Sequence, residues 1–255
     1  MKYLFRDGGL KIVESLFFTD TLFAFDFDGT LSEIVLDYAD ARIKDTTLDL
    51  IKSLNARVPV AIISGRSVND LRRRISFRPE FLVGNHGLEQ LGRKARNDSA
   101  AKRMCASWRK HMAALLKAGE FAGVEVEDKV FSLALHYRKS RSKKETKLAL
   151  LALAGSLQPS PRIILGKSVI NLIPVGAPHK GIAVMEMMLS IGAKCGFYVG
   201  DDDTDEDVFN LPDARIIGVR VGKKISSQAQ YFIKRQSEIN RLLKAMLKFA
   251  ERGAL

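Results

Sequence analysis

Two aspartates separated by one residue stand at the end of an apolar run near the start of the chain. Residues 22–27 are aliphatic and aromatic apart from Asp26, and they lead directly into Asp28. Carboxylates this close repel each other, so their pairing favours a bound cation. Oxygen ligands favour a hard ion, most commonly Mg²⁺. Gly29 allows a tight turn and Thr30 adds a hydroxyl group. A solvated turn is the alternative interpretation of this motif taken alone.

A second acidic stretch follows another apolar run, residues 195–199. Residues 201–207 hold six acidic side chains in seven positions. Such a run on a surface is usually solvated charge. In a chain whose formal net charge is +12, acid concentrated directly after a strand indicates a cation site instead.

Two further polar residues stand where they could face an anion. Ser64 follows the apolar run 58–63, so its hydroxyl and the nearby amides could face a phosphoryl oxygen. Turn chemistry is the alternative for a serine at a strand end. Lys180 is the first residue of a predicted helix, a position where a cation is unfavourable. This favours an anionic partner for Lys180, with an exposed helix lysine as the alternative interpretation.

The elements that position these residues follow from the apolar pattern. Four apolar runs are predicted to be buried parallel strands, each followed by a polar loop: residues 22–27, 58–63, 81–83 and 195–199. Helices are predicted between them: residues 46–55, 68–75 and 180–190, the last closed by Gly192. Strand, polar loop and helix in repetition predict a doubly wound parallel-sheet, Rossmann-like α/β core. Such sheets bind ligands at the carboxyl ends of their strands.

The middle of the chain has a different pattern of apolar residues, which predicts an inserted α+β cap. We expect helices over 104–116 and 144–157 and strands over 124–127, 130–137 and 168–173. The predicted core is therefore residues 1–100 with 175–255, and the predicted cap is residues 101–174. Residues 237–252 repeat apolar side chains at helical spacing, with Ser237 as the predicted cap and Gly253 as the stop.

Composition excludes several classes of protein. The 255 residues are 46% hydrophobic and 27% charged, which allows a sizeable core and excludes overall disorder. No signal-peptide core or membrane-spanning run is present, and two cysteines make no disulfide framework, so we expect reduced cysteines and a cytoplasmic location. We also expect a monomer. The basic clusters 72–74, 93–96 and 139–144 are not interleaved with aromatic residues. This disfavours a nucleic-acid partner and favours solvated faces or steering of an anionic substrate.

The order of these motifs resembles the haloacid dehalogenase-like hydrolase superfamily. The matching residues are Asp26–Thr30, Ser64, Lys180 and Gly200–Asp202. The resemblance implies that Asp26 attacks phosphorus and forms an aspartyl-phosphate. It implies that Asp28 protonates the leaving oxygen and then activates water. Thr30, Ser64 and Lys180 would neutralise the phosphoryl oxygens.

The same resemblance implies a Mg²⁺ cofactor and its ligands. Asp26, Asp201 and the main-chain carbonyl of Asp28 would coordinate the ion. Asp202 and Asp205 would hold its water molecules.

Finer motifs resemble the trehalose-6-phosphate phosphatase family across residues 20–225. They are Ile63–Arg66, Gly84–Glu89, Leu135–Arg138 and Gly200–Phe209. The resemblance implies hydrolysis of trehalose 6-phosphate, a small sugar phosphate, to trehalose and phosphate. The residues it implies for substrate binding are Arg66, Asn85 and His86 in the core and Glu127, Lys129, Arg138 and Asn171 in the cap.

One departure from this family pattern leaves the sugar open. The family usually carries glutamate where Asn171 stands and often arginine where Ile173 stands. Asn171 can still form hydrogen bonds but is no charged acceptor. A related phosphatase acting on a sucrose, mannosylglycerate or glucosylglycerate precursor is therefore an alternative. A non-catalytic basic binding module is another, although the intact Asp26 and Asp28 speak against it.

Overall fold

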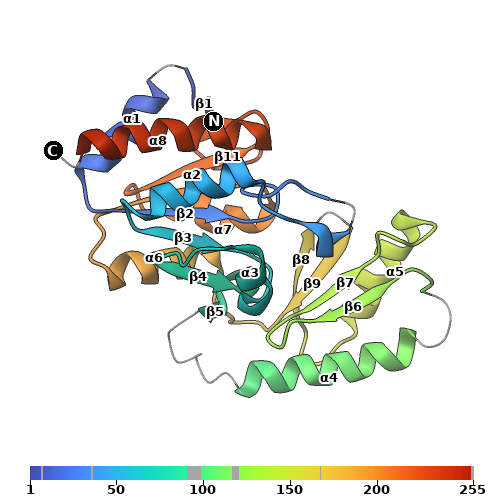
Figure 1. Ribbon diagram of the computed structural model, residues 1–255. Helices are drawn as coiled ribbons and strands as arrows, with labels where there is room; N and C mark the ends of the chain where they lie inside the picture. Colours follow the sequence, from blue (N-terminus) through green and yellow to red (C-terminus); the bar gives the residue numbers. More distant parts are fainter. Residues whose placement is uncertain (7, 36, 91–98, 117–120, 167, 254–255) are drawn as a thin grey trace. The chain divides into compact units, whose positions relative to one another are not determined.

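The computed structural model describes residues 1–6, 8–35, 37–90, 99–116, 121–166 and 168–253. The chain forms two compact units (Figure 1). The core unit comprises Met1–Leu91 and His179–Leu255, and the inserted unit comprises Gly92–Pro178. Among the described residues, no helix has both the length and the apolar character needed to cross a membrane.

The described part of the core unit is built on an eight-stranded sheet. Its strands, in spatial order, are β1 (Lys2–Tyr3), β12 (Tyr231–Ile233), β11 (Ile216–Val221), β10 (Cys195–Gly200), β2 (Thr21–Asp26), β3 (Val60–Ile63), β4 (Phe81–Gly84) and β5 (Glu89–Gln90). Neighbouring strands are parallel except for β4 and β5. The predicted doubly wound parallel core is confirmed.

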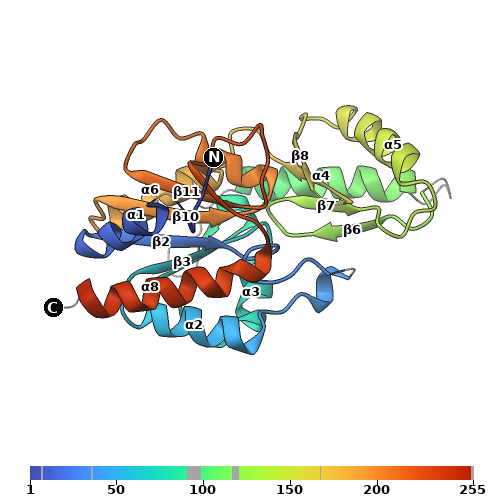
Figure 2. The same cartoon turned by 90° about the horizontal axis from the view of Figure 1, so that it is seen from above.

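Helices cover both faces of this sheet because its strands are buried on both sides. Phe23 and Phe25 of β2 pack with α2 (Asp45–Asn55) and α8 (Ile239–Gly253). The alternating Leu22 and Ala24 pack with α6 (Lys180–Ser190) and α7 (Glu206–Phe209). Figure 2 shows α2 and α8 on one side of the sheet and α6 on the other. The remaining helices of the unit are α1 (Gly9–Ser15), α3 (Val68–Arg74), η1 (Leu16–Phe18), η2 (Tyr38–Asp40), η3 (Asn85–Gly87), η4 (Asp203–Asp205) and η5 (Gln236–Glu238).

The inserted unit is the predicted α+β structure. Its described strands form an antiparallel sheet in the order β6 (Glu125–Asp128), β7 (Leu133–His136), β9 (Val169–Ile173) and β8 (Arg162–Gly166). Its helices are α4 (Ser99–Leu116) and α5 (Lys143–Gly155). Alternate residues of β7 and β9, such as Leu133 and Leu172, bury one sheet face against Trp108 of α4 and Leu150 of α5. This unit therefore has an apolar cluster of its own.

Several element boundaries differ from the predicted ones for local reasons. The tail helix α8 begins at Ile239 because residues 236–238 form a separate 3₁₀ turn, so Ser237 is not its cap. The strand predicted from Val130 begins at Leu133. Val130 has a left-handed φ of 71°, and the amide of Lys129 donates to the carbonyl of Ser132, so this stretch is a turn. Gly192 has a φ of 67° just after α6 and ends that helix as predicted.

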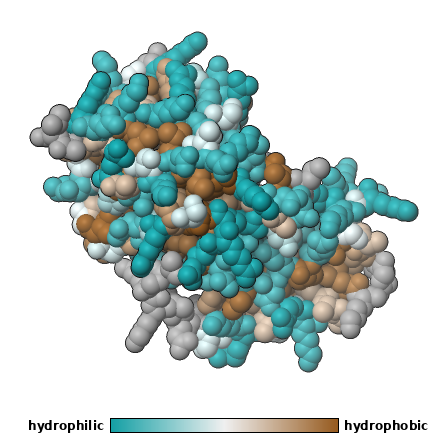
Figure 3. Space-filling view, in the orientation of Figure 1, coloured by the Kyte–Doolittle hydropathy of each residue, from teal (hydrophilic) through white to brown (hydrophobic). Residues whose placement is uncertain are grey.

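The surface is mixed in character. Hydrophilic side chains cover most of the face in Figure 3, with smaller apolar areas between them. Apolar atoms form much of the surface of most folded proteins, so these areas are ordinary. Of the three basic clusters, residues 93–96 lie outside the described residues.

Candidate active site

The sheet topology brings the predicted loops to one edge. β2 lies between β10 and β3, and all three strands are parallel. Asp26 is paired with Ile63 and Phe25 is paired with Val199. The loops that follow these strands therefore leave the sheet at the same carboxyl edge. After β2, the chain adds β3 and β4 on one side of it and later adds β10, β11 and β12 on the other side. Open α/β sheets form ligand sites where the strand order reverses in this way.

A buried lysine joins two of the predicted acidic residues. The Nζ atom of Lys180 lies 2.7 Å from Oδ1 of Asp26 and 2.7 Å from Oδ1 of Asp205. The lysine side chain is only 2% exposed, so the alternative of an exposed helix lysine is wrong. Burial alone would lower the pKa of Lys180, but the charges of Asp205 and Asp26 outweigh it and raise the pKa. Lys180 is therefore held as a cation.

Three carboxylates form a compact buried cluster. One oxygen from each of Asp26, Asp201 and Asp205 lies within 4.8 Å of the others. Burial, followed by the charges of Asp205 and Asp201, raises the pKa of Asp26 against the opposing effect of Lys180. Taken by themselves, the three carboxylates and the ammonium of Lys180 carry a formal charge of minus two. Carboxylate oxygens in this number and charge balance fit a hard divalent cation such as Mg²⁺.

Gly29 makes room for this cluster. A Cβ atom on Gly29 would lie 2.2 Å from Oδ2 of Asp201, and the glycine has a φ of 82°. A side chain there would both strain the backbone and displace the carboxylate. The sequence predicts the tight turn, and the close approach to Asp201 explains why the turn needs glycine.

Asp205 accepts from two donors besides Lys180, and sequence reasoning missed one of them, Tyr198. The hydroxyl of Tyr198 donates to Oδ1 of Asp205 at 2.6 Å, and the amide of Asp202 donates to Oδ2 at 2.8 Å. Burial, followed by the charge of Asp205, raises the pKa of Tyr198 well above its usual value. The hydroxyl therefore stays protonated and acts as a donor. Tyr198 stands inside the apolar run of β10, where nothing in the pattern distinguishes it from a core aromatic.

Arg220 is a second residue that the sequence analysis missed. It is buried on β11, and its guanidinium donates to the carbonyls of Asp201 at 2.6 Å and Asp202 at 2.9 Å. It also donates to Oε1 of Glu206 at 2.9 Å. Arg220 thus fixes the backbone of the acidic loop. An arginine inside an apolar strand is the signal that could have found it.

Asp28 lies apart from the three-carboxylate cluster and contacts Arg66 instead. Both of its oxygens accept from Arg66, at 2.6 and 2.7 Å. The side chain of Asp28 is 38% exposed, while that of Arg66 is 8% exposed. The structure therefore brings two predicted site residues together, but it directs Arg66 to a carboxylate.

Thr30 and Ser64 are both buried at the same edge of the sheet. The hydroxyl of Thr30 has no hydrogen-bond partner among the described residues. The Oγ atom of Ser64 accepts from the amide of Arg66 at 3.2 Å. A buried hydroxyl without a partner is costly, so the Thr30 hydroxyl fits a site that receives a polar ligand atom.

Asn85 and His86 lie against the loop that carries Ser64. The amide of His86 donates to the carbonyl of Ser64 at 3.0 Å, and a Cβ on Gly65 would lie 2.4 Å from Cε1 of His86. Nδ2 of Asn85 donates to Oε2 of Glu89 at 2.9 Å. Asn85 and His86 have left-handed φ angles of 49° and 59°. Strained conformations of this kind cluster at functional sites.

The remaining predicted substrate contacts belong to the inserted unit. Glu127 and Asn171 both align with the same residue of β7, so they face the same side of that sheet. Oε2 of Glu127 lies 2.9 Å from Nε2 of His136 and 3.8 Å from Nζ of Lys129. Asn171 is buried, and Arg138 is half-buried just beyond the end of β7. Sequence reasoning missed His136 as the partner of Glu127.

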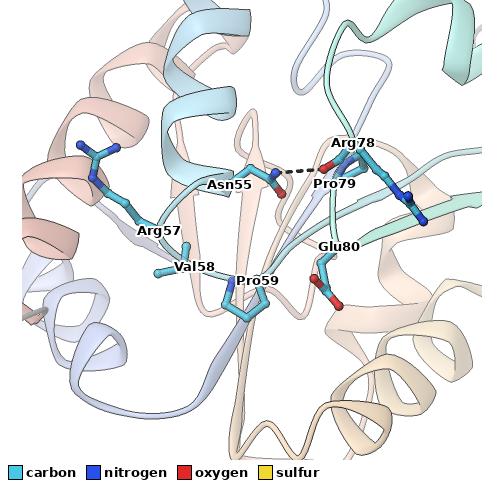
Figure 4. A pocket seen from close by; sticks show the side chains of 7 residues that line it. All are labelled: Asn55, Arg57, Val58, Pro59, Arg78, Pro79 and Glu80. Atoms are coloured by element: carbon cyan, nitrogen blue, oxygen red, sulfur yellow. Dashed lines mark hydrogen bonds between the residues drawn. The ribbon is translucent and has the colours of Figure 1, made fainter.

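A separate cavity of about 520 Å³ lies at the opposite edge of the core sheet (Figure 4). It is lined by Asn55, Arg57, Val58, Pro59, Arg78, Pro79 and Glu80. These residues precede β3 and β4, so the cavity is at the amino ends of the strands. Within it, Nδ2 of Asn55 donates to the carbonyl of Arg78 at 3.0 Å. It holds none of the predicted site residues.

Comparison with known families identifies one match that covers most of the chain. The family described as trehalose-phosphatase matches residues 24–236. A trehalose-phosphate phosphatase of Mycobacterium bovis is 34% identical over 197 residues, covering 73% of this chain and 50% of that protein. Its counterpart from Mycobacterium ulcerans is 31% identical over 229 residues, covering 87% of this chain and 57% of that protein. The chain spans about half the length of these curated relatives.

Solved structures share the fold. The C-terminal domain of a trehalose-6-phosphate phosphatase from C. albicans matches with a TM-score of 0.79 at 21% identity, over 95% of this chain and 97% of that one. A trehalose-6-phosphate phosphatase related protein matches with a TM-score of 0.75 at 22% identity, over 91% of this chain and 99% of that one. At these identities the likeness speaks for the fold alone.

Proposed function

The chain belongs to the trehalose-phosphatase family, and we propose that it is a phosphoric monoester hydrolase that converts trehalose 6-phosphate to trehalose and phosphate. The observation that carries the proposal is the buried contact of Lys180 with Asp26 and Asp205, beside Asp201. These residues come from three distant segments of the chain. They form a site with a nucleophilic carboxylate, a fixed cation and the charge balance for a divalent metal ion.

In the proposed reaction, Asp26 is the nucleophile. One of its oxygens forms a bond to phosphorus while the bond from phosphorus to the sugar oxygen breaks, and Asp28 gives that oxygen a proton. A water molecule then attacks phosphorus and passes a proton to Asp28. This second step releases phosphate and restores the carboxylate of Asp26. Dividing the reaction in this way replaces one difficult step by two easier ones.

Three residues would offset the negative charge on the phosphoryl oxygens. Lys180 supplies a fixed ammonium, and the hydroxyl groups of Thr30 and Ser64 supply hydrogen bonds from buried positions. Such preorganised groups in a site that excludes water stabilise the transition state more than they would in water. The unpartnered hydroxyl of Thr30 supports this role.

We propose Mg²⁺ as the cofactor. Asp26, Asp201 and the main-chain carbonyl of Asp28 would hold it, with Asp202 and Asp205 holding its water molecules. When bound, the ion supplies positive charge toward the phosphoryl oxygens and the attacking carboxylate. The close grouping of three carboxylates supports a divalent ion.

Substrate recognition is assigned to both units. Asn85 and His86 would contact the substrate from the core, and four cap residues would contact the sugar: Glu127, Lys129, Arg138 and Asn171. The division into a core of residues 1–100 and 175–255 and a cap of residues 101–174 is part of this proposal. Because Asn171 is no charged acceptor, a related sugar phosphate is the second candidate substrate. A cytoplasmic monomer remains the prediction of the sequence.

Phosphate release from a panel of sugar phosphates tests the proposal. With Mg²⁺ present, trehalose 6-phosphate should be hydrolysed faster than sucrose, mannosylglycerate and glucosylglycerate phosphates and glucose 6-phosphate, and chelator should abolish release. Asp26→Asn should remove turnover while circular dichroism stays unchanged. A folded Asp26→Asn variant that still turns over the best substrate would contradict the assigned nucleophile. Equal rates on trehalose 6-phosphate and glucose 6-phosphate would contradict the assigned sugar.

A further inference from the structure

Arg66 is the centre of a buried polar network. Its Nε and Nη2 atoms donate to the two oxygens of Asp28, its Nη1 donates to Asp70 at 2.8 Å, and its Nη2 also donates to the carbonyl of Tyr38 at 2.8 Å. These contacts use four of the five N–H donors of a guanidinium group. The guanidinium carbon also lies 5.5 Å from the centre of the Phe27 ring. These contacts leave one N–H donor of Arg66 to bind a sugar.

Asp70 fixes Arg66 from the other side. It stands four residues further along, on α3, and Arg74 stands four residues beyond it. Arg74 donates to both oxygens of Asp70 at 2.9 Å and to the carbonyl of Ala41 at 2.6 Å. Burial would raise the pKa of Asp70, but the hydrogen bonds from Arg74 and Arg66 outweigh it and lower the pKa. Asp70 is therefore ionised, and from α3 it anchors Arg66, which precedes that helix.

We propose that Arg66, held by Asp70, is a positioning residue that fixes the carboxylate of Asp28 for proton transfer. This inference rests on the proposed function, in which Asp28 exchanges protons with the sugar oxygen and with water. It gives Arg66 the role of orienting Asp28, the acid–base residue, in place of a contact with the sugar. It also gives Asp70 a role in the reaction, although Asp70 contacts Asp28 only through Arg66.

The physical reason is geometric. Proton transfer requires the donor and acceptor to be within hydrogen-bond reach, about 2.6–3.2 Å. The Asp28 side chain is 38% exposed and would otherwise move among rotamers. Two parallel bonds from a guanidinium restrict a carboxylate in both position and plane. Lysine carries the same charge but has no planar fork, so it cannot replace arginine here.

Two variants and one control separate positioning from sugar binding. Asp70→Asn removes the anchor charge without touching Asp28, and Arg66→Lys keeps the charge but removes the fork. Asp49→Asn, on the exposed face of α2, is the matched control. We would measure kcat and KM with the best sugar phosphate and with p-nitrophenyl phosphate, whose leaving group departs without a proton. Circular dichroism would establish that each variant is folded.

The expected result is a kcat effect that depends on the leaving group. General acid–base catalysis contributes about 10²- to 10⁴-fold, so we expect kcat with the sugar phosphate to fall about tenfold in Asp70→Asn and further in Arg66→Lys. KM should change less than about twofold, since the sugar contacts are intact. The value of kcat/KM should fall more for the sugar phosphate than for p-nitrophenyl phosphate. Asp49→Asn should match the wild-type protein.

Three results would overturn the inference. A higher KM with unchanged kcat in both variants would return Arg66 to sugar binding. Equal losses of kcat/KM on the two substrates would leave only a structural role. Wild-type kinetics in both variants would exclude any role. Because the test uses the best sugar phosphate, a wild-type preference for another sugar would contradict the proposed function alone, while a protein that hydrolyses no phosphate ester contradicts both.

Discussion

Replacing Lys180 with methionine would test the charge balance of the buried cluster directly. Methionine has a similar length and fills the space without a charge, so Asp26 and Asp205 lose their shared donor. The formal charge of Lys180 and the three clustered carboxylates, taken by themselves, changes from minus two to minus three. Removing one partner of a buried ion pair costs about 3–5 kcal/mol, because the other charge is left without compensation. The 2% exposure of the Lys180 side chain justifies that range.

Metal and acid should each offset this loss. A divalent cation binds the folded site and stabilises it by mass action. It should stabilise Lys180→Met more than the wild-type protein, because the variant site is more negative. Burial already raises the pKa of Asp26, and loss of Lys180 raises it further, so the folded variant gains protons before the unfolded chain does. Its deficit should therefore shrink as the pH falls from 8 toward the ordinary carboxyl pKa of about 4.

Urea unfolding, followed by fluorescence at several pH values with chelator or with Mg²⁺, is the measurement. Lys194→Met is the matched control, because Lys194 pairs with Asp20 on the surface at 3.2 Å with both side chains mostly exposed. Such a pair is worth about 0–1 kcal/mol, so the control should change little. Equal stability of Lys180→Met and Lys194→Met in chelator at neutral pH would contradict the predicted loss of charge compensation. A larger stabilisation of the wild-type protein than of Lys180→Met by Mg²⁺ would contradict the predicted gain in negative charge.

Three further predictions concern residues around this site and in the inserted unit. Tyr198→Phe removes the hydroxyl that donates to Asp205. A hydrogen bond to a charged group is worth about 1.5–3 kcal/mol, so the free energy of urea unfolding should fall by an amount in that range. An unchanged urea midpoint would contradict this prediction. Burial raises the pKa of Cys105 to about 12, so a thiol reagent at pH 8 should modify it only after denaturation. The lowered pKa of Asp70 stabilises the fold above the unfolded carboxyl pKa of about 3.9, and this contribution is lost as the pH falls through the lower folded value. The difference in melting temperature between wild type and Asp70→Asn should accordingly be largest near neutral pH and vanish in acid.

The sequence predicts the parts of the site that depend on local pattern. β2 and β10 are each an apolar run that ends at acidic residues, and both features are visible within ten residues. That is enough to predict parallel strands, their polar loops and a cation between them. The short strands β1 and β5 are not predicted, because a strand of two residues is too short to show an alternating apolar pattern. The strand β11 is not predicted, because Gly218 and Arg220 interrupt its apolar pattern.

The sequence does not predict contacts that depend on strand register. Asp28 and Arg66 are 38 residues apart, and each alone is typical of a polar loop. Pairing of Asp26 with Ile63 brings them together, because Asp28 and Arg66 lie two and three residues beyond that pair. Register is set by the turns and packing of the whole sheet, which no local motif records. For this reason the family resemblance implied substrate binding for Arg66, and only the fold revealed its contact with Asp28.

Three basic residues of the chain are buried beside the acidic residues of the site. Lys180 from α6, Arg220 from β11 and Arg66 from the loop after β3 are all buried, and each contacts acidic residues or their carbonyls at the carboxyl edge of the sheet. Buried charges persist only when they are paired and hydrogen-bonded. Each cation therefore requires its acidic partner, and the acidic residues could not be crowded together without the cations. Cations from three segments of the chain thus offset part of the acidic charge, and the cluster of Asp26, Asp201 and Asp205 is where we propose the divalent ion.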